Sequence, residues 1–461
     1  MIRLFRHFIP LSLLLLAGLE FLLFLEIAEF SAENYFQGHG AHDAYGAGYR
    51  PWLFAAVLTL MNSVFGLYEW GWTRGPLAMT SRVLGSLAVT TLLYAGASRF
   101  LTDPFLIRSG MVAAIAMSGL TSLLIRLLFM EFGKTDMFKR RVLVVGAGTR
   151  AAALDDIIAA GEDKGILVVG YLPMGSPHRY VAEDRVIDEE GSIYEIARRL
   201  RVEEIVVAIR QRRQGGMPSA ELLECKLRGI PVSEMANFCE RQTGLIPLGS
   251  LNTSWIIFAD GFAPGSLRDS IKRLFDLLVS GLFLLATGPV MLLFFVLIKL
   301  ESRGPALYTQ VRVGQNDEPF TIYKFRSMRT DAEKDGVPIW ARKNDNRITR
   351  VGAFIRRTRI DELPQILNVF LGHMSFVGPR PERPYFVDEL ASQIPFYRAR
   401  HSVKPGITGW AQVKFPYGAS VEDAMHKLEY DLYYVKNHSL FLDFSILLQT
   451  VQVVVLGKGV R

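Results

Sequence analysis

Five long apolar runs constrain this chain more than any other feature of its sequence. Four fall near the N-terminus, at residues 8–28, 52–68, 83–101 and 106–130, and the fifth covers residues 271–300. A helix needs roughly 20 apolar residues to cross the hydrocarbon core of a bilayer. The first run lacks a small-residue cleavage pattern, so we interpret it as a retained span rather than a signal peptide. The pattern predicts four N-terminal transmembrane helices within residues 1–133.

Basic residues beside these runs predict the orientation, because cytoplasmic loops of membrane proteins carry an excess of Lys and Arg. They precede the first run, separate the second from the third, and follow the fourth: Arg3, Arg6, Arg74, Arg82, Lys134, Lys139, Arg140 and Arg141. We therefore expect a multi-pass protein of the inner (cytoplasmic) membrane with these segments in the cytoplasm. Charged residues interrupt the runs at Glu20, Glu26 and Arg126. Intramembrane charge often marks a functional site, but we expect these side chains to snorkel from helix ends.

The fifth run contains Gly288-Pro289 near its middle. A proline inside a helix removes one hydrogen bond and kinks the chain. Basic residues flank both ends, at Lys272 and Arg273 and at Lys299 and Arg303, which favours placing both ends on the cytoplasmic side. These features predict a re-entrant helix over residues 271–300 that breaks at Gly288 and Pro289.

Length and charge limit the classes of protein to consider. A chain of 461 residues is expected to hold two or three units. Its formal net charge of +7 favours an anionic partner, either a lipid surface or a phosphorylated substrate, and no nucleic-acid-binding module is present. Cys225 and Cys239 are the only cysteines, which favours free thiols in a reducing compartment over disulfides or a cysteine metal site.

Residues 139–240 have the pattern of a Rossmann-like α/β domain. The expected strands lie near residues 142–145, 166–170, 205–209 and 230–232, and the helices near 152–160, 192–200 and 218–228. A GxGxxA turn runs from Gly146 through Gly148 to Ala151. The second strand ends at Tyr171 without the acidic residue that would hold a ribose hydroxyl, so a structural or regulatory domain is favoured over a dinucleotide site. Residues 241–265 are interpreted as a linker.

The densest chemistry lies in residues 356–382, inside a C-terminal domain at 266–461. Asp361 and Glu362 are adjacent, and Pro364 predicts that a helix over residues 362–370 begins beside them. Arginines at 356, 357, 359 and 380 could bind phosphate oxygens with their guanidinium forks. Aspartate is a known nucleophile for phosphoryl groups, which favours phosphoryl transfer. Alternatively, Asp361 only caps a helix and the arginines form a solvated face.

Four sequence blocks in this order resemble the bacterial sugar transferases, a family of polyprenyl-phosphate hexose-1-phosphate transferases. The blocks are Lys324-Phe325-Arg326-Ser327-Met328-Arg329, Asp361-Glu362-Leu363-Pro364-Gln365 with Asn368, Met374-Ser375-Phe376-Val377-Gly378-Pro379-Arg380-Pro381, and Lys404-Pro405-Gly406-Ile407-Thr408-Gly409-Trp410-Ala411-Gln412. The likeness covers residue 271 to the C-terminus closely. The resemblance implies a fold with four N-terminal transmembrane helices, a Rossmann-like domain, a re-entrant membrane helix and a small α+β catalytic domain.

The resemblance also implies an activity. The enzyme would transfer a hexose-1-phosphate from a UDP-sugar to polyprenyl (undecaprenyl) phosphate on the cytoplasmic membrane face and so start exopolysaccharide or O-antigen synthesis. Asp361 would attack the phosphorus bearing the sugar, and Asp361 and Glu362 would hold Mg²⁺. The implied substrate-binding residues are Arg356, Arg380, Lys324, Arg326, Gln365 and Pro379. The layout before residue 271 resembles the long form of the family, for which a homodimer is expected. Glucose or galactose is the expected sugar, with N-acetylated sugars as the alternative.

Two other classes of protein remain open. An NAD-dependent nucleotide-sugar dehydratase or epimerase would use Gly146 and Gly148, but the α/β region lacks the Tyr-x-x-x-Lys pair that such enzymes need. A non-catalytic scaffold of a polysaccharide export complex would leave Asp361 and Glu362 without a purpose.

Overall fold

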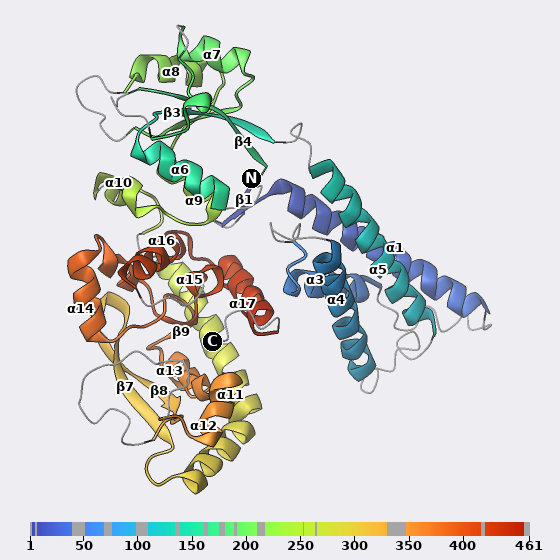
Figure 1. Cartoon of the computed structure of the whole chain (residues 1–461). Coiled ribbons are helices and arrows are strands. Elements are labelled where there is room, and N and C mark those ends of the chain that lie inside the picture. Colours follow the sequence, from blue (N-terminus) through green and yellow to red (C-terminus); the bar gives the residue numbers. More distant parts are fainter. Residues whose placement is uncertain are drawn as a thin grey trace. The chain divides into compact units, whose positions relative to one another are not determined.

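The computed structural model describes residues 2–4, 7–38, 51–68, 76–97, 109–133, 139–160, 165–174, 180–188, 191–209, 217–251, 253–262, 265–329, 347–415 and 420–455 (Figure 1). Arg6, Arg74 and Lys134, on which the predicted orientation depends, lie outside these residues. The chain divides into two compact units. One comprises Met1–Leu4 and Phe8–Thr243, and the other comprises Phe5–His7 and Gly244–Arg461. Two short strands at the N-terminus, β1 (Ile2–Leu4) and β2 (His7–Ile9), pair with each other.

Four apolar helices follow: α1 (Leu11–Gly38), α3 (Pro51–Val64), α4 (Pro76–Ala97) and α5 (Ser109–Gly133). Helices α1, α4 and α5 contain segments long and apolar enough to cross a membrane. The second predicted span is too long, because α3 has only 14 residues. At 1.5 Å per residue it measures about 21 Å, against a hydrocarbon core of about 30 Å. It ends where Gly66 adopts a positive φ of 68°.

A buried polar network connects these four helices. Glu20 of α1 and Arg126 of α5 have no exposed surface, and they form an ion pair with each other. The Glu20 carboxylate also accepts hydrogen bonds from the hydroxyl of Ser122, at 3.0 Å, and from the hydroxyl of Tyr68. Asn62 of α3 accepts from the hydroxyl of Ser86 on α4 at 2.6 Å. The expectation that Glu20 and Arg126 snorkel is therefore wrong: each compensates the charge of the other inside the bundle.

The α/β region contains a parallel sheet in the order β4-β3-β5-β6. Its strands are β3 (Arg140–Val145), β4 (Ile166–Leu172), β5 (Glu204–Val207) and β6 (Val232–Glu234), and its helices are α6 (Thr149–Ala160), α7 (Ile193–Arg199), α8 (Ser219–Leu227) and α9 (Met235–Thr243), with a 3₁₀ turn, η3 (Glu183–Arg185). Val142 and Val144 pack with residues of α6 and α9, whereas Leu143 and Val145 pack with residues of α7 and α8. This alternation follows from the two-residue period of a strand and puts helices on both faces of the sheet.

The glycine turn after β3 has a geometry that requires glycine. Gly146 has a φ of 120°, and a Cβ on it would lie 3.0 Å from the backbone oxygen of Ala208. The backbone N–H of Tyr180 donates to the carbonyl of Ala147 at 2.8 Å, so part of the turn is bound by the chain itself. At the end of β4, the guanidinium of Arg185 lies 5.1 Å from the ring centre of Tyr171.

The second unit contains one long helix, α11 (Ser266–Glu301), an antiparallel hairpin, and a group of shorter helices. The hairpin is β7 (Leu307–Val313) and β8 (Pro319–Phe325), joined through η5 (Gln315–Asp317). The other elements are η4 (Leu248–Ser250), α10 (Thr253–Phe258), α12 (Arg350–Arg357), η6 (Ile360–Glu362), α13 (Gln365–Leu371), β9 (Ser375–Val377), α14 (Pro384–Gln393), η7 (Tyr397–Ser402), β10 (Gly406–Thr408), α15 (Trp410–Lys414), α16 (Val421–Asn437) and α17 (Leu440–Val455). Strands β9 and β10 are parallel neighbours.

Most of the stretch predicted to be a linker, residues 241–265, belongs to the second unit: residues 241–243 end α9, whereas the described residues 244–251 and 253–262 are part of the second unit. Ile246 is fully buried in its core, and the backbone N–H of Leu248 donates to the carboxylate of Glu429 on α16 at 2.9 Å. The indole of Trp255 lies under the ammonium of Lys436, 4.4 Å from the ring centre to Nζ. The apolar side chains of this stretch pack in or against the core of the second unit. Its mixed composition, with scattered Gly and Pro, did not predict this packing.

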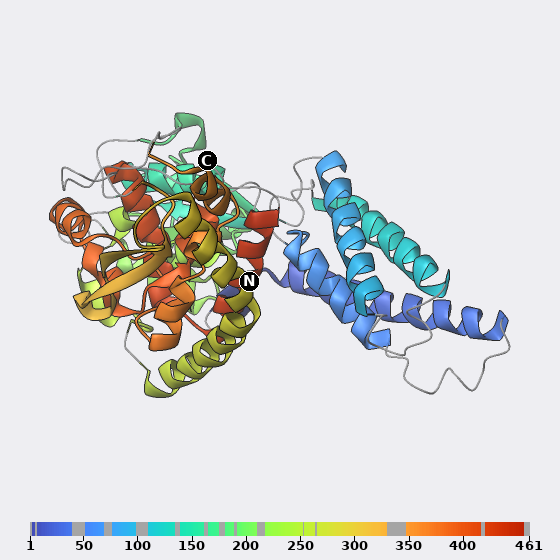
Figure 2. The same ribbon diagram turned by 90° about the horizontal axis from the view of Figure 1, so that it is seen from below.

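Helix α11 continues through Gly288 and Pro289, so the predicted break does not interrupt the helix. Both views show that it changes direction along its length (Figures 1 and 2). The hydroxyl of Thr287 donates to the carbonyl of Phe283 at 2.7 Å and not to the carbonyl of Leu285, which loses its helical donor at Pro289. A proline removes only one backbone donor, so a bend without a break is enough to accommodate Pro289.

Candidate active site

Asp361 and Glu362 lie on the turn η6, between helices α12 and α13. Arg359 precedes the turn with a φ of 58°, a left-handed conformation that reverses the chain after α12. The helix predicted for residues 362–370 begins later than expected, at Gln365, and Pro364 occupies its N-cap position. Asp361 therefore stands one turn ahead of α13 and is not its cap. This position leaves its carboxylate available for other chemistry.

The carboxylate of Asp361 has an unused oxygen. Its Oδ1 is buried and has no hydrogen-bond partner among the described residues. Burial raises the pKa of Asp361 to about 6, and the negative charge of Glu362 adds to the rise, whereas Lys324, Arg359 and Arg356 oppose it. A buried carboxylate with a free oxygen and a raised pKa is typical of a reacting group or a metal ligand, because a structural carboxylate is normally fully paired.

Glu362 is surrounded by cations. Its Oε1 lies 3.0 Å from the Nζ of Lys324 and 3.4 Å from an Nη of Arg380, and its Oε2 lies 3.9 Å from an Nη of Arg359. Burial alone would raise the pKa of Glu362, but Lys324, Arg380 and Arg359 outweigh it and lower the pKa to about 2. Burial lowers the pKa of Lys324, and Glu362 opposes this shift. Glu362 is therefore ionised, and it binds a cation from strand β8 and another from the segment after β9.

The segment that carries Arg380 is held by close backbone contacts. A Cβ on Gly378 would lie 2.2 Å from the carbonyl oxygen of Lys404, and one on Gly406 would lie 2.1 Å from the backbone nitrogen of Gly378. The N–H of Gly406 donates to the carbonyl of Pro379 at 2.9 Å. Pro379 is buried. The third and fourth sequence blocks therefore meet here, and only glycine allows their backbones to approach so closely.

The remaining predicted site residues have different surroundings. Arg356 lies in the last turn of α12, close enough to Asp361 to lower its pKa. Gln365 is buried at the start of α13. Asn368 is also buried, and its side chain binds the backbone of β8: Nδ2 donates to Thr321 and Oδ1 accepts from Tyr323. Asn368 thus fixes α13, and the turn before it, against the strand that carries Lys324.

Arg326 has its contacts at the end of α11. It is 6% exposed, and its guanidinium donates to the carbonyls of Ser302 and Arg303 at 2.9 and 3.2 Å. These carbonyls follow the C-terminal end of α11, where unpaired backbone oxygens need donors. The geometry therefore gives Arg326 a structural partner, and its predicted role in substrate binding has no support from these contacts.

Sequence reasoning missed Asp276, which fixes α11 against the site. Asp276 is 2% exposed, and its Oδ1 accepts from the Ser375 hydroxyl at 3.1 Å and from the Phe376 N–H at 3.3 Å. One turn earlier, Lys272 donates to the carbonyl of Val377 at 3.2 Å. The only available signal was a single acidic residue in an otherwise apolar run, and its partners lie a hundred residues away.

The donor set suits a magnesium ion in part. Mg²⁺ prefers oxygen ligands, often one or two carboxylates together with substrate phosphates and waters. Asp361 Oδ1 fits this role, whereas Glu362 Oε1 already faces Lys324 and Arg380. Among the described residues, no group of three or more His, Cys, Asp or Glu side chains could hold a metal. Substrate phosphates would have to complete such a site.

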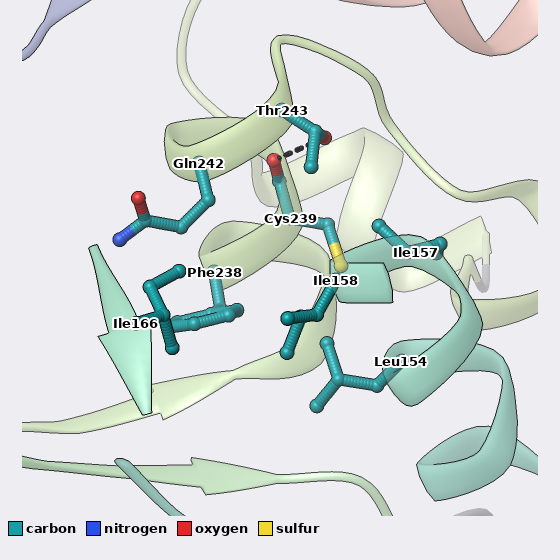
Figure 3. Close-up of a pocket in the computed structure, with 8 residues that line it drawn as sticks. All are labelled: Leu154, Ile157, Ile158, Ile166, Phe238, Cys239, Gln242 and Thr243. Carbon is teal, nitrogen blue, oxygen red and sulfur yellow. Dashed lines mark hydrogen bonds between the residues drawn. The ribbon is translucent and has the colours of Figure 1, made fainter. Parts of the chain in front are cut away.

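A separate small pocket lies in the α/β region, between α6, α9 and β4 (Figure 3). It is lined by Leu154, Ile157, Ile158, Ile166, Phe238, Cys239, Gln242 and Thr243. Its lining is almost entirely apolar and contains no charged side chain, so it does not suit a phosphorylated ligand.

The sequence is similar to known enzymes over different lengths. Residues 267–457 match the family described as "Bacterial sugar transferase". A UDP-glucose:undecaprenyl-phosphate glucose-1-phosphate transferase of Xanthomonas campestris pv. campestris is 30% identical over 435 residues, covering 88% of this chain and 87% of that protein. A UDP-N-acetylgalactosamine-undecaprenyl-phosphate N-acetylgalactosaminephosphotransferase of Aeromonas hydrophila is 42% identical over 57% of this chain, and the match spans 61% of that protein.

A third relative matches over a shorter part of the chain. A UDP-glucose:undecaprenyl-phosphate glucose-1-phosphate transferase of Klebsiella pneumoniae is 44% identical over 182 residues, or 39% of each chain. The chain thus spans less than two thirds of the Aeromonas and Klebsiella proteins, although it spans most of the Xanthomonas protein.

Proposed function

Because the chain belongs to the bacterial sugar transferase family, we propose that it transfers a sugar-1-phosphate from a UDP-sugar to polyprenyl phosphate. The observation that carries this proposal is the buried, unpartnered Oδ1 of Asp361 beside the ion cluster of Glu362, Lys324 and Arg380. Such a site keeps one carboxylate oxygen unpaired and places cations close to it. The exchange of one diphosphate linkage for another mainly requires that anions be positioned and neutralised, and Lys324 and Arg380 supply positive charge for this.

The reaction has two displacements. First, a carboxylate oxygen of Asp361 attacks the phosphorus that bears the sugar; an O–P bond forms, the diphosphate O–P bond breaks, and UMP leaves with its electron pair. Second, an oxygen of polyprenyl phosphate attacks the same phosphorus, and the Asp361 carboxylate leaves. The products are UMP and a polyprenyl diphosphate sugar. Lys324, Arg356 and Arg380 bind and orient the phosphates by charge-assisted contacts.

Asp361 and Glu362 would hold Mg²⁺ together with the diphosphate. When bound, the ion neutralises charge on the phosphates and draws them toward the carboxylates. Lys324 and Arg380, which contact Glu362, would also bind oxygens of the substrate phosphates.

We further propose that α11 is re-entrant and that both its ends face the cytoplasm with the active site. At the N-terminal end of α11, Arg273 donates to the carbonyls of Val369 and Phe370 on α13, each at 2.7 Å. Near the C-terminal end, the rings of Phe294 and Phe354 stack 5.8 Å apart, and the Glu301 carboxylate accepts from the N–H of Val351 on α12. One compact catalytic unit binds both ends, so a bilayer could not separate them without dividing that unit.

The α/β region is proposed to be a Rossmann-like domain without a catalytic dinucleotide. The end of β4 carries Tyr171 instead of an acidic residue, and its ring is covered by Arg185. UMP release independent of added NAD would agree with this proposal.

The main test uses membranes that contain the full chain, labelled UDP-sugars and no lipid acceptor. The wild type should release a burst of UMP in proportion to the enzyme, because the covalent step precedes acceptor attack. Asp361→Asn should release none, and the matched control Asp388→Asn, an exposed carboxylate of α14, should behave as wild type. Undiminished UMP release from Asp361→Asn would refute the assignment of the nucleophile. NAD-dependent conversion of the sugar, or no reaction with any UDP-sugar, would support the two rival classes instead.

A second test addresses α11. Leu267 and Leu300 lie near its two ends and are 74% and 78% exposed. Single cysteines at these positions, in a chain whose Cys225 and Cys239 are replaced by alanine, should both be shielded from an impermeant thiol reagent in intact cells and should both react after lysis. Labelling of one position alone from outside would mean that α11 crosses the membrane.

A further inference from the structure

The backbone around Arg380 is held at three points, Pro379, Arg380 and Glu382, by three different elements. The carbonyl of Pro379 accepts from β10, as described above. The carbonyl of Glu382 accepts from the N–H of Val313 on β7 at 3.0 Å. Between them, the carbonyl of Arg380 itself accepts from a side chain, an Nη of Arg400 at 3.1 Å. The position of the Arg380 backbone therefore depends on Arg400.

Arg400 is buried where an arginine is costly. It comes from η7 and is 6% exposed. One Nη donates to the hydroxyl of Tyr397 at 2.7 Å, and the other lies 2.7 Å from Oδ2 of Asp431 as well as donating to Arg380. Asp431, on α16, is 2% exposed. The two charges compensate each other, but apolar residues of similar volume often give equal or greater stability than such a buried pair.

What an apolar pair would lack is a donor for the carbonyl of Arg380. Asp431 fixes the guanidinium of Arg400 from one side, and Tyr397 fixes it from another. The Nη that faces Asp431 then also donates to one backbone oxygen. Because that oxygen belongs to Arg380, a small rotation of Arg400 would move the backbone from which the Arg380 side chain reaches Glu362, 3.4 Å away. Misplacement of a catalytic group by about 1 Å can cost on the order of 100-fold in rate.

We propose that Arg400 and Asp431 are positioning residues: their buried ion pair holds the backbone of Arg380 so that its guanidinium meets Glu362 and the phosphates of the substrate. This inference rests on the proposed function, because it assigns the pair a part in binding those phosphates. Neither residue touches the substrate. Their effect on transfer passes through Arg380 alone.

The test is a double-mutant cycle with the full chain in membranes, read as kcat/KM for UMP release. The variant Arg400→Met with Asp431→Leu removes both charges and keeps the volume. It should lower kcat/KM roughly tenfold or more, as expected for a displaced charge-assisted contact. Added to Arg380→Ala, the same pair of changes should lower kcat/KM less than about twofold, because the contact is already absent. Arg398→Lys, an exposed arginine of the same turn, is the control and should have no effect.

Each outcome is informative. Equal losses in the two backgrounds would show that the pair supports the fold in general and would overturn the inference, as would no loss at all. If the protein with both replacements does not accumulate in membranes, Asp431→Asn, which keeps the side-chain shape, takes its place in the same cycle. Arg400→Lys should be more active than Arg400→Met. A wild type that releases no UMP would contradict the proposed function itself, whereas multiplicative losses with an active wild type contradict only the positioning role.

Discussion

The raised pKa of Asp361 predicts an acid limb in the covalent step. With a pKa of about 6, Asp361 is about 90% ionised at pH 7 and about 10% at pH 5. Only the ionised form is a nucleophile, so the rate of the UMP burst should fall about tenfold between these two pH values. Glu362, with a pKa of about 2, remains ionised throughout and acts as a constant neighbouring charge.

The assay measures the burst of UMP from pH 4.5 to 8 without lipid acceptor. Omitting the acceptor matters because a phosphate monoester titrates near pH 6, whereas both phosphates of a UDP-sugar are esterified and stay ionised. Asp388→Asn serves as the control and should reproduce the wild-type profile.

A second variant tests the cause of the shift. Glu362→Gln removes a negative charge that raises the pKa of Asp361 and frees Lys324, which lowers it. Any residual burst should therefore have its midpoint at lower pH than the wild type. A wild-type midpoint near pH 4, the ordinary value for an exposed carboxylate, would refute the reasoning, and so would a shift of the variant toward higher pH.

Four further outcomes are expected. Arg380→Ala should cost roughly 1.5–3 kcal/mol of transition-state binding, measured as kcat/KM for UMP release, and unchanged kinetics would make it a surface charge. Gly406→Ala should destabilise the second unit by about 1–3 kcal/mol or more in thermal denaturation, because its Cβ would meet a backbone nitrogen at 2.1 Å. Arg126→Met should cost about 3–5 kcal/mol of stability by leaving Glu20 charged and buried, and adding Glu20→Leu should recover much of it; no recovery would contradict the pairing. Chelation with EDTA should abolish UMP release and added Mg²⁺ should restore it, and full activity in EDTA would exclude the proposed metal.

The sequence predicted those features whose causes are local. Periodicity placed the four strands near residues 142–232, and the spacing of the carboxylates and arginines placed Asp361, Glu362 and Arg380 in one cluster. The sequence did not predict the structural partners of Arg326 or Asp276. These side chains bind backbone groups that are 24 and 100 residues away, and no pattern in the surrounding sequence records such a contact.

The length of α3 and the role of residues 241–265 were missed for a related reason. A positive φ at Gly66 ends α3, although the apolar run continues to Tyr68. Ile246 and Trp255 lie in short apolar groups without a clear helix or strand period, and their contacts on α16 are far away in the sequence.

The contact among the backbones of Gly378, Gly406 and the carbonyl of Lys404 has a consequence for protein engineering. A Cβ on Gly409 would also lie 2.3 Å from the carbonyl oxygen of Gly378. The backbones of the two chain segments are thus in direct contact, and no side chain fits between them. A chimera that exchanges residues 374–381 for another enzyme's sequence, in order to change which sugar is transferred, should carry residues 404–412 with it as a single cassette.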